Sequence, residues 1–318
     1  MLLSEKMKQT NFSNAETALV TYILEKGTAI ESMTIKEIAE ANFVHPSTLI
    51  RVAKKLGYKG WLELRTEFLA EQTYLQTYFE DVDANFPFQT NDGIMTIANK
   101  IASLERTTID DTLSLLNHDD LQKAKQLLLN AKQIKIFGSN ANLLISQDFA
   151  LKMRRIKKNV VTSQTLGEDT YEAYNSQADT CAILISYTGE NNFILQLARI
   201  LRKQNIPVIA LTSIGENTLA SYSQAVLRIT TRERLYSKIA NFTINSSICY
   251  LLDVLYSCVF AEDYQKNLNH LIEIGELADK RKTSSEIMAE SPESMIRFTE
   301  SFRSSRGESQ LTFRPSHT

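Results

Sequence analysis

Basic side chains gather in one short stretch of a chain that is otherwise slightly acidic. Between His45 and Arg65 there are five basic residues and one acid, whereas the full chain of 318 residues has a net charge of −2. Guanidinium and ammonium groups bind phosphate oxygens, and arginine also binds the edge of guanine. The stretch is a candidate for contact with nucleic acid; the alternative is a solvated basic face on an ordinary helix. Its basic residues are Arg51, Lys54, Lys55, Lys59 and Arg65.

Two short amphipathic helices with a turn between them are expected to position these groups. Thr34 and Glu37 have the spacing of a capping box at the start of the first helix. Two such helices are typical of a helix-turn-helix, whose second helix enters the major groove. The apolar stripe of the second helix is predicted at Leu49, Val52, Ala53 and Leu56. The opposite face is expected to point outward, and the predicted DNA contacts are His45, Ser47, Thr48, Arg51, Lys54 and Lys55.

Two polar loops further along the chain have the composition of phosphate or sugar sites. Gly138-Ser139-Asn140 follows an apolar run, and a glycine there lets backbone amides approach a phosphate at a helix N-terminus. The segment from Ser186 to Asn191 supplies two hydroxyls, a glycine and an amide after another apolar run. Ligands of parallel sheets bind at the carboxyl ends of strands. The alternative for each loop is a polar turn that caps the next helix.

Short apolar runs alternate with helical patterns from residue 134 onward, which predicts a parallel sheet covered by helices on both faces. The pattern favours an all-α helix-turn-helix domain followed by an α/β domain with a five-stranded parallel sheet. A long apolar helix from about Ser237 to Phe260 is expected to close the second domain. The five predicted strands are Ile134–Phe137, Val160–Thr162, Cys181–Ser186, Pro207–Thr212 and Ala225–Ile229.

Shifts in composition divide the chain into a helix-turn-helix domain at residues 1–78, a linker at 79–92, an α/β domain at 93–280 and a disordered tail at 281–318. The three cysteines form no CxxC pair, and their odd number argues against a disulfide framework. There is no signal-peptide pattern and no continuous apolar run long enough for a membrane span, so we expect a cytoplasmic protein with no membrane partner.

Residues 34–65, TIKEIAEANFVHPSTLIRVAKKLGYKGWLELR, resemble the N-terminal domain of the RpiR-type transcription regulators. Phe43 stands where that family usually has a turn glycine, and His45 stands where it has a serine N-cap. Because a Phe at positive φ is strained, Asn42 is the expected residue for that conformation. The matching positions are Ala39, Val44, Thr48, Arg51, Lys54, Leu56, Gly57, Tyr58, Gly60, Trp61, Glu63 and Leu64.

Residues 130–260 resemble a sugar isomerase (SIS) domain through IFGSNAN, SYTGEN, IALTS with NTLA, and Glu233. Three departures fall on the loops: Asn140 replaces a glycine, Asn142 replaces a phosphate-binding serine, and Asn191 replaces a threonine. Thr188 is a conservative change from serine. Glu233 is expected either to bond a sugar hydroxyl or to pair with Arg232 or Arg234. The ligand residues implied by the resemblance are Gly138, Ser139, Asn142, Ser186, Thr188, Gly189, Asn191 and Glu233.

Together the two resemblances imply a transcriptional regulator of carbohydrate metabolism genes whose binding to a double-stranded DNA operator is modulated by a sugar phosphate. A homodimer or homotetramer is expected because operator symmetry mirrors protein symmetry. No cofactor or metal is implied. The alternative is a sugar-phosphate isomerase, which needs a general base such as Glu233. No histidine–carboxylate constellation supports that alternative.

Overall fold

The computed structural model describes residues 2–77, 82–162, 167–281, 283–285 and 287–288. The chain divides into two units, residues 1–267 and residues 268–318. Residues 79–81 of the predicted linker lie outside the described residues, and so does nearly all of the predicted disordered tail at 281–318.

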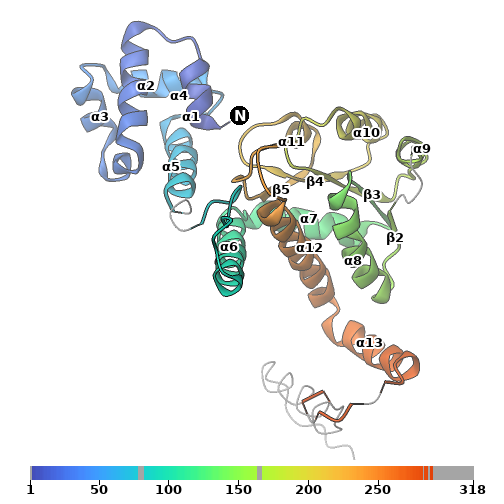
Figure 1. The fold of residues 1–318 in the computed structure, drawn as a ribbon. Coiled ribbons are helices and arrows are strands. Elements are labelled where there is room, and N and C mark those ends of the chain that lie inside the picture. The colour runs from blue at the N-terminus through green and yellow to red at the C-terminus, as the bar shows by residue number, and fades with distance from the viewer. Residues whose placement is uncertain (1, 78–81, 163–166, 282, 286, 289–318) are drawn as a thin grey trace, which may run out of the picture. The chain divides into compact units, whose positions relative to one another are not determined.

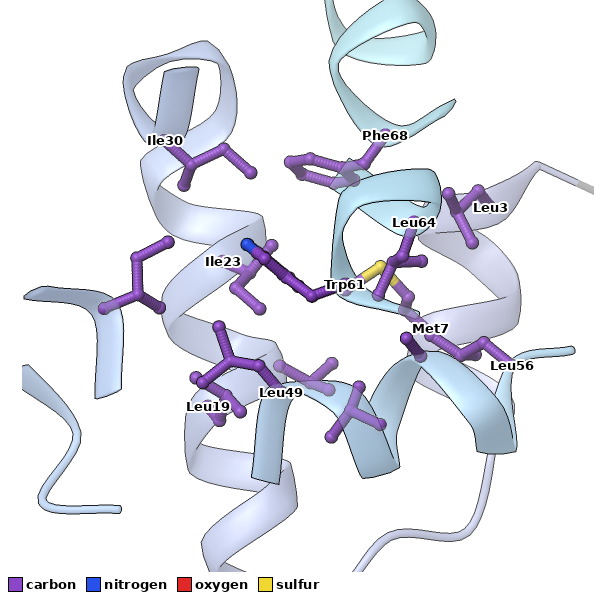
Figure 2. Close-up of a cluster of buried hydrophobic side chains, with 14 of the residues drawn as sticks. Leu3, Met7, Leu19, Ile23, Ile30, Leu49, Leu56, Trp61, Leu64 and Phe68 are labelled. Carbon is purple, nitrogen blue, oxygen red and sulfur yellow. The ribbon is translucent and has the colours of Figure 1, made fainter. Parts of the chain in front are cut away.

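The N-terminal residues form a helical domain around one apolar core. Leu19 and Ile23 of α2 pack with Leu49 and Leu56 of the α4 region and with Phe68 of α5, and all five are almost fully buried (Figure 2). The predicted stripe of the second short helix is therefore confirmed. The elements are α1 (Leu3–Gln9), α2 (Asn14–Lys26), the 3-10 helix η1 (Gly27–Ser32), α3 (Ile35–Ala41), α4 (Pro46–Lys55) and α5 (Trp61–Thr77).

The turn between α3 and α4 differs from the expectation at one residue. Phe43 has φ +54, whereas Asn42 ends α3 with φ −110. The prediction that Asn42 takes the left-handed conformation is therefore wrong. The Asn42 side chain is engaged elsewhere, because its Nδ2 donates to the carbonyl of Ile38 at 2.8 Å. Phe43 packs on nothing, since 99% of it is exposed.

A five-stranded parallel sheet forms the core of the second domain, as predicted. The strand order is β2-β1-β3-β4-β5, and Ile136 of β1 lies opposite Ile183 of β3. The chain adds β2 on one side of β1 and β3 on the other, so the strand order reverses between β1 and β3. Ligands of such sheets bind at the carboxyl ends of the two strands where the order reverses. The strands are β1 (Gln133–Phe137), β2 (Val160–Thr162), β3 (Thr180–Ser186), β4 (Val208–Ser213) and β5 (Ala225–Ile229).

Helices cover both faces of this sheet (Figure 1). One face carries α9 (Asp169–Tyr174), α10 (Asn192–Lys203) and α11 (Thr218–Tyr222). The other carries the remaining helices of the domain, which pack on one another and on β1, β2 and β5. They are α6 (Ile94–Ser114), α7 (His118–Asn130), α8 (Ala141–Arg155) and α12 (Phe242–Glu262).

Helix α12 begins later than predicted. Residues 230–241, which we call the β5–α12 loop, are irregular, so the expected start near Ser237 is wrong. By length and mean hydropathy, 1.5, α12 alone among the described helices would suffice to cross a membrane. Its residues Leu251, Leu252 and Leu255 are buried, and the helix packs on α6, α7, α8 and β5. These contacts are those of a core helix in a folded domain.

The second unit begins within the last helix of the described chain, α13 (Tyr264–Ala278), which buries no residue.

Candidate nucleic-acid interface and ligand site

One face of α4 presents basic groups, as the sequence predicts. Arg51, Lys54 and Lys55 are exposed, and the apolar stripe on the opposite face is buried. Thr48 is a correction, because it is only 6% exposed. It lies beside Leu49 on the inner side of the helix. The prediction that Thr48 points outward is therefore wrong.

His45 and Ser47 join each other at the start of α4. The Nδ1 atom of His45 accepts the backbone N–H of Ser47 at 3.2 Å, and the Ser47 hydroxyl lies 2.9 Å from the same nitrogen. His45 thus caps the helix in place of the usual serine, and Pro46 occupies the first helical position. Both side chains remain exposed at the N-terminal end of the basic face.

A buried carboxylate holds two of the basic residues. Glu16 of α2 is 1% exposed, and its Oε1 accepts from Nε of Arg51 at 2.7 Å while its Oε2 accepts from Nζ of Lys55 at 2.6 Å. The hydrogen bond from Lys55 is the largest of the contacts that lower the pKa of Glu16, to about 2. Sequence reasoning missed this residue. The Ser13–Glu16 spacing signals a capping box, but it says nothing of partners on another helix.

The loop after β1 leads into α8, whose N-terminus has no side-chain cap. Gly138 is buried, and a Cβ placed there would lie 3.2 Å from Cβ of Asn142. Asn140 has φ +53, and no side chain caps α8. The backbone N–H groups of Asn142 and Leu143 donate at 3.2 Å to the carbonyls of Ser139 and Asn140, so an anion at this helix start would compete with these two bonds. Ser139 and Asn142 lie in this same loop and first turn.

The loop after β3 lies beside that of β1, because the two strands are neighbours in the sheet. Ser186 is buried at the end of β3. The hydroxyl of Thr188 accepts the backbone N–H of Glu190 at 3.1 Å. Gly189 has φ +67 and lies against Asn217, the residue before α11. The fold therefore brings the two predicted polar loops together at the carboxyl ends of β1 and β3.

Asn191, a predicted ligand residue, uses its side-chain oxygen within the protein. The side-chain oxygen of Asn191 caps α10, accepting the backbone N–H groups of Phe193 and Ile194 at 3.0 Å and 3.2 Å. This is the capping role that the sequence left open as the alternative. Asn191 is also exposed, whereas Ser186 of the same loop is buried.

Glu233 is engaged at both of its carboxylate oxygens. Its Oε1 accepts the backbone N–H groups of Thr243 and Ile244 in the first turn of α12, at 2.6 Å and 3.2 Å. Its Oε2 pairs with Lys238 at 2.9 Å. The predicted pairing with Arg232 or Arg234 is therefore wrong: Arg232 pairs with Asp111 of α6. A carboxylate held in this way stabilises a helix N-terminus and is poorly placed to act as a general base.

Helix-turn-helix geometry at the N-terminus, followed in the chain by a doubly wound parallel sheet, defines a class: helix-turn-helix regulators with an α/β domain. Family models give the same division, since residues 1–73 match the helix-turn-helix domain of the rpiR family and residues 127–257 match the SIS domain. The chain belongs to the rpiR family of HTH-type transcriptional regulators.

Two relatives that match this chain along nearly their whole length are also named HTH-type transcriptional regulators. An HTH-type transcriptional regulator from Thermotoga maritima is 30% identical over 83% of this chain and 94% of the relative. One from Caldanaerobacter subterraneus subsp. tengcongensis is 27% identical over 86% of this chain and 95% of the relative.

Two solved structures share the fold. The Vibrio vulnificus NanR protein complexed with ManNAc-6P has a TM-score of 0.53 at 22% identity and covers 86% of this chain and 97% of its own. The sugar isomerase domain of an RpiR transcription factor from Sphaerobacter thermophilus has a TM-score of 0.50 at 13% identity, over 56% of this chain and 98% of its own.

Proposed function

We propose that this regulator reads an operator of double-stranded DNA with α4 and that a sugar phosphate in the β1 and β3 loops modulates the reading. The observation that carries the proposal is one chain with an outward basic helix face and two polar loops that meet at the strand crossover. NanR, which shares the fold, was solved with ManNAc-6P. In this proposal the protein acts in the cytoplasm and regulates genes of carbohydrate metabolism.

On the DNA side, Arg51 is the candidate for base edges, and Lys54 and Lys55 are candidates for phosphates. Ser47 and His45 lie at the end of α4 from which a recognition helix usually contacts bases. Thr48 is too buried to be a first choice for direct contact. We propose a homodimer or homotetramer, so that two copies of α4 meet the two halves of a symmetric operator.

On the ligand side, the uncapped N-terminus of α8 suits the phosphate. Ser139, Asn142, Ser186 and Thr188 suit the sugar and phosphate oxygens. Asn191, whose side-chain oxygen caps α10, and Glu233, whose two carboxylate oxygens are engaged, contribute through the shape of the loops.

We propose further that the chain is not an isomerase. The engaged carboxylate of Glu233 supports this, and the relatives are named as transcriptional regulators. An assay of aldose–ketose interconversion with the sugar phosphates that bind tests it. Turnover abolished by Glu233→Gln would favour the enzyme instead.

The test of the regulator is an operator titration. Full-length protein selects a duplex from a random pool, and fluorescence anisotropy then measures its affinity with and without each of a panel of hexose, hexosamine and N-acetylhexosamine phosphates. We expect at least one phosphate to shift the operator affinity and the unphosphorylated sugar to have no effect. A sugar phosphate that binds in a thermal-shift assay but leaves operator affinity unchanged would contradict the coupling.

A further inference from the structure

Glu16 links the helix core to the outward face of α4. We infer that Glu16 is a positioning residue for DNA reading, which fixes where Arg51 and Lys55 present their charges. The inference rests on the proposed contact between α4 and the operator.

The carboxylate of Glu16 is held by the backbone of its own helix start. Its Oε2 accepts the backbone N–H of Ser13 at 2.9 Å, which closes the capping box of α2. It is almost fully buried, whereas the side chains of Arg51 and Lys55 are 58% and 41% exposed. Each ion pair therefore has one fixed end in the domain and one cation at the surface. Lys55 is held further because its ammonium lies 5.8 Å from the ring centroid of Phe12.

The geometry leaves the reading edge of Arg51 available. Glu16 takes the Nε of the guanidinium, and the far edge of that planar group carries the two terminal nitrogens. Such an edge matches the paired acceptors of guanine in the major groove. A guanidinium fixed at one edge loses less freedom when the other edge meets a base.

Charge leads to the same conclusion. Arg51 and Lys55 are one helical turn apart on α4, a spacing at which like charges repel. The carboxylate between them offsets that repulsion and keeps both side chains close to α2. Without it, both cations would be free to follow phosphate oxygens, which carry no sequence information. Loss of the Glu16 charge should therefore weaken discrimination while leaving or raising affinity for random DNA.

The experiment is the substitution Glu16→Gln in the full chain, with Glu37→Gln as the matched control. Glutamine retains the reach needed for the capping box in each case. Glu37 closes the capping box of α3 through Thr34, on the same domain and with the same loss of one charge. Anisotropy measures affinity for the selected duplex and for a scrambled duplex, and circular dichroism confirms the fold of both variants.

We expect Glu16→Gln to lower the ratio of selected to scrambled affinity by about tenfold, within the range for one base contact. We expect Glu37→Gln to leave that ratio unchanged. Equal ratios in the two variants would overturn the positioning role. A wild-type protein that binds both duplexes equally would instead count against operator reading by α4, so the two failures are distinct.

A different set of contacts lies on the β5–α12 loop. Asn85, in the middle of the predicted linker, is buried against that loop. Its Oδ1 accepts the backbone N–H of Arg234 at 2.7 Å, and its carbonyl accepts the N–H of Ile239 at 2.9 Å. Asp83 fixes the linker turn by accepting the N–H of Asn85 at 2.7 Å. The later part of the linker is therefore docked on the domain.

The same loop contacts the predicted ligand loop after β3. The hydroxyl of Tyr187 donates to the carbonyl of Glu233 at 2.8 Å, and the ammonium of Lys238 lies 5.8 Å from the Tyr187 ring centroid. Tyr187 stands between Ser186 and Thr188, both proposed ligand contacts. Glu233 and Lys238, which contact Tyr187, each precede a residue that Asn85 binds. Those two residues are Arg234 and Ile239.

We infer that the β5–α12 loop relays the state of the sugar-phosphate site to the linker, with Tyr187 at one end and Asn85 at the other. This second inference also rests on the proposed function. The loop contacts both the ligand loop and the linker, so it supplies a continuous chain of packed and hydrogen-bonded residues along which coupling can travel.

Hydrogen–deuterium exchange of the full chain tests the relay without any effector. Tyr187→Phe removes one hydroxyl, and Tyr171→Phe removes the same group from an exposed position on α9. We expect Tyr187→Phe to speed exchange at residues 83–86 and 232–239 by about two- to tenfold, the range for losing one hydrogen bond. We expect no change in Tyr171→Phe. Unchanged exchange at 83–86 in Tyr187→Phe would overturn the relay, whatever the outcome of the effector titrations.

Discussion

Gly189 and Asn217 lie so close that no side chain fits between them. A Cβ placed on Gly189 would come within 2.2 Å of Cγ and Oδ1 of Asn217. Asn217 cannot easily move, because its Oδ1 caps α11 through Ala220 and its Nδ2 donates to Thr212 at 3.1 Å. The carbonyl of Gly189 also accepts the N–H of Leu219 at 3.0 Å. The β3 loop thus takes its shape from the β4–α11 connection.

Gly189→Ala should distort the proposed ligand site while leaving the DNA-binding domain intact. We expect a loss of ~1–3 kcal/mol in the free energy of unfolding of the α/β domain, from overpacking at a site that also requires φ +67. We also expect the thermal shift with sugar phosphates to disappear. Gly167→Ala is the control, because Gly167 has φ +89 but no neighbouring atom within 4 Å. Equal effects of the two substitutions would show that backbone strain, rather than Asn217, is responsible.

Phe43→Gly should stabilise the helix-turn-helix domain. Phe43 has φ +54 and makes no packing contact that its removal would cost. A left-handed non-glycine residue costs roughly 1–2 kcal/mol, part of which is offset by the greater freedom of glycine in the unfolded chain. We expect a net gain of ~0.5–1 kcal/mol in urea denaturation. Phe43→Ala, which removes the ring but keeps a Cβ, should show no such gain.

Arg51→Ala should reduce sequence preference, whereas Lys54→Ala should reduce affinity for every duplex. Arg51→Ala is expected to abolish most of the preference for the selected duplex, by about tenfold or more. Lys54 makes no ion pair within the residues that the structure describes, and its loss should weaken all duplexes alike. It should also lower the slope of log affinity against log salt by about one. A preference that survives Arg51→Ala would mean that another face of the domain reads the DNA.

The stability of the chain should fall in acid partly through Glu16. Its pKa drops from 4.5 to about 2 on folding, so its charge stabilises the folded state above pH 4.5. That contribution is lost progressively as the pH falls from 4.5 toward 2. Urea denaturation at pH 7 and pH 4 should show a smaller difference in Glu16→Gln than in the wild type. An identical difference would mean that other carboxylates account for the acid sensitivity.

Periodicity and motif spacing predicted the elements well because each depends on neighbouring residues. The five strands and the stripe of α4 lie within one or two residues of their expected places. The meeting of the Gly138 and Ser186 loops follows from parallel strands that both end in polar turns.

Long-range partners could not be predicted in the same way. Glu16 and Arg51 are 35 residues apart, and Asn85 and Arg234 are 149 apart, so no local pattern links them. The apolar stripe of α4 predicts Thr48 on the outward face, yet the residue lies at the edge of that stripe and is buried. Phe43 takes φ +54 against its own preference because α3 and α4, which pack on each other, fix the turn between them.

The bridge from Glu16 to Arg51 and Lys55 also limits how this helix can diverge. In a duplicated gene that evolves toward a new operator, replacing Arg51 or Lys55 alone would leave the buried Glu16 carboxylate with one of its two ion pairs missing. The positions that can change without touching Glu16 are Ser47, Ile50 and Lys54, all exposed on α4. Descendants with new operators, and libraries built to find them, should therefore vary residues 47 and 50 while keeping the triad at 16, 51 and 55, and changes at residue 54 should alter overall affinity.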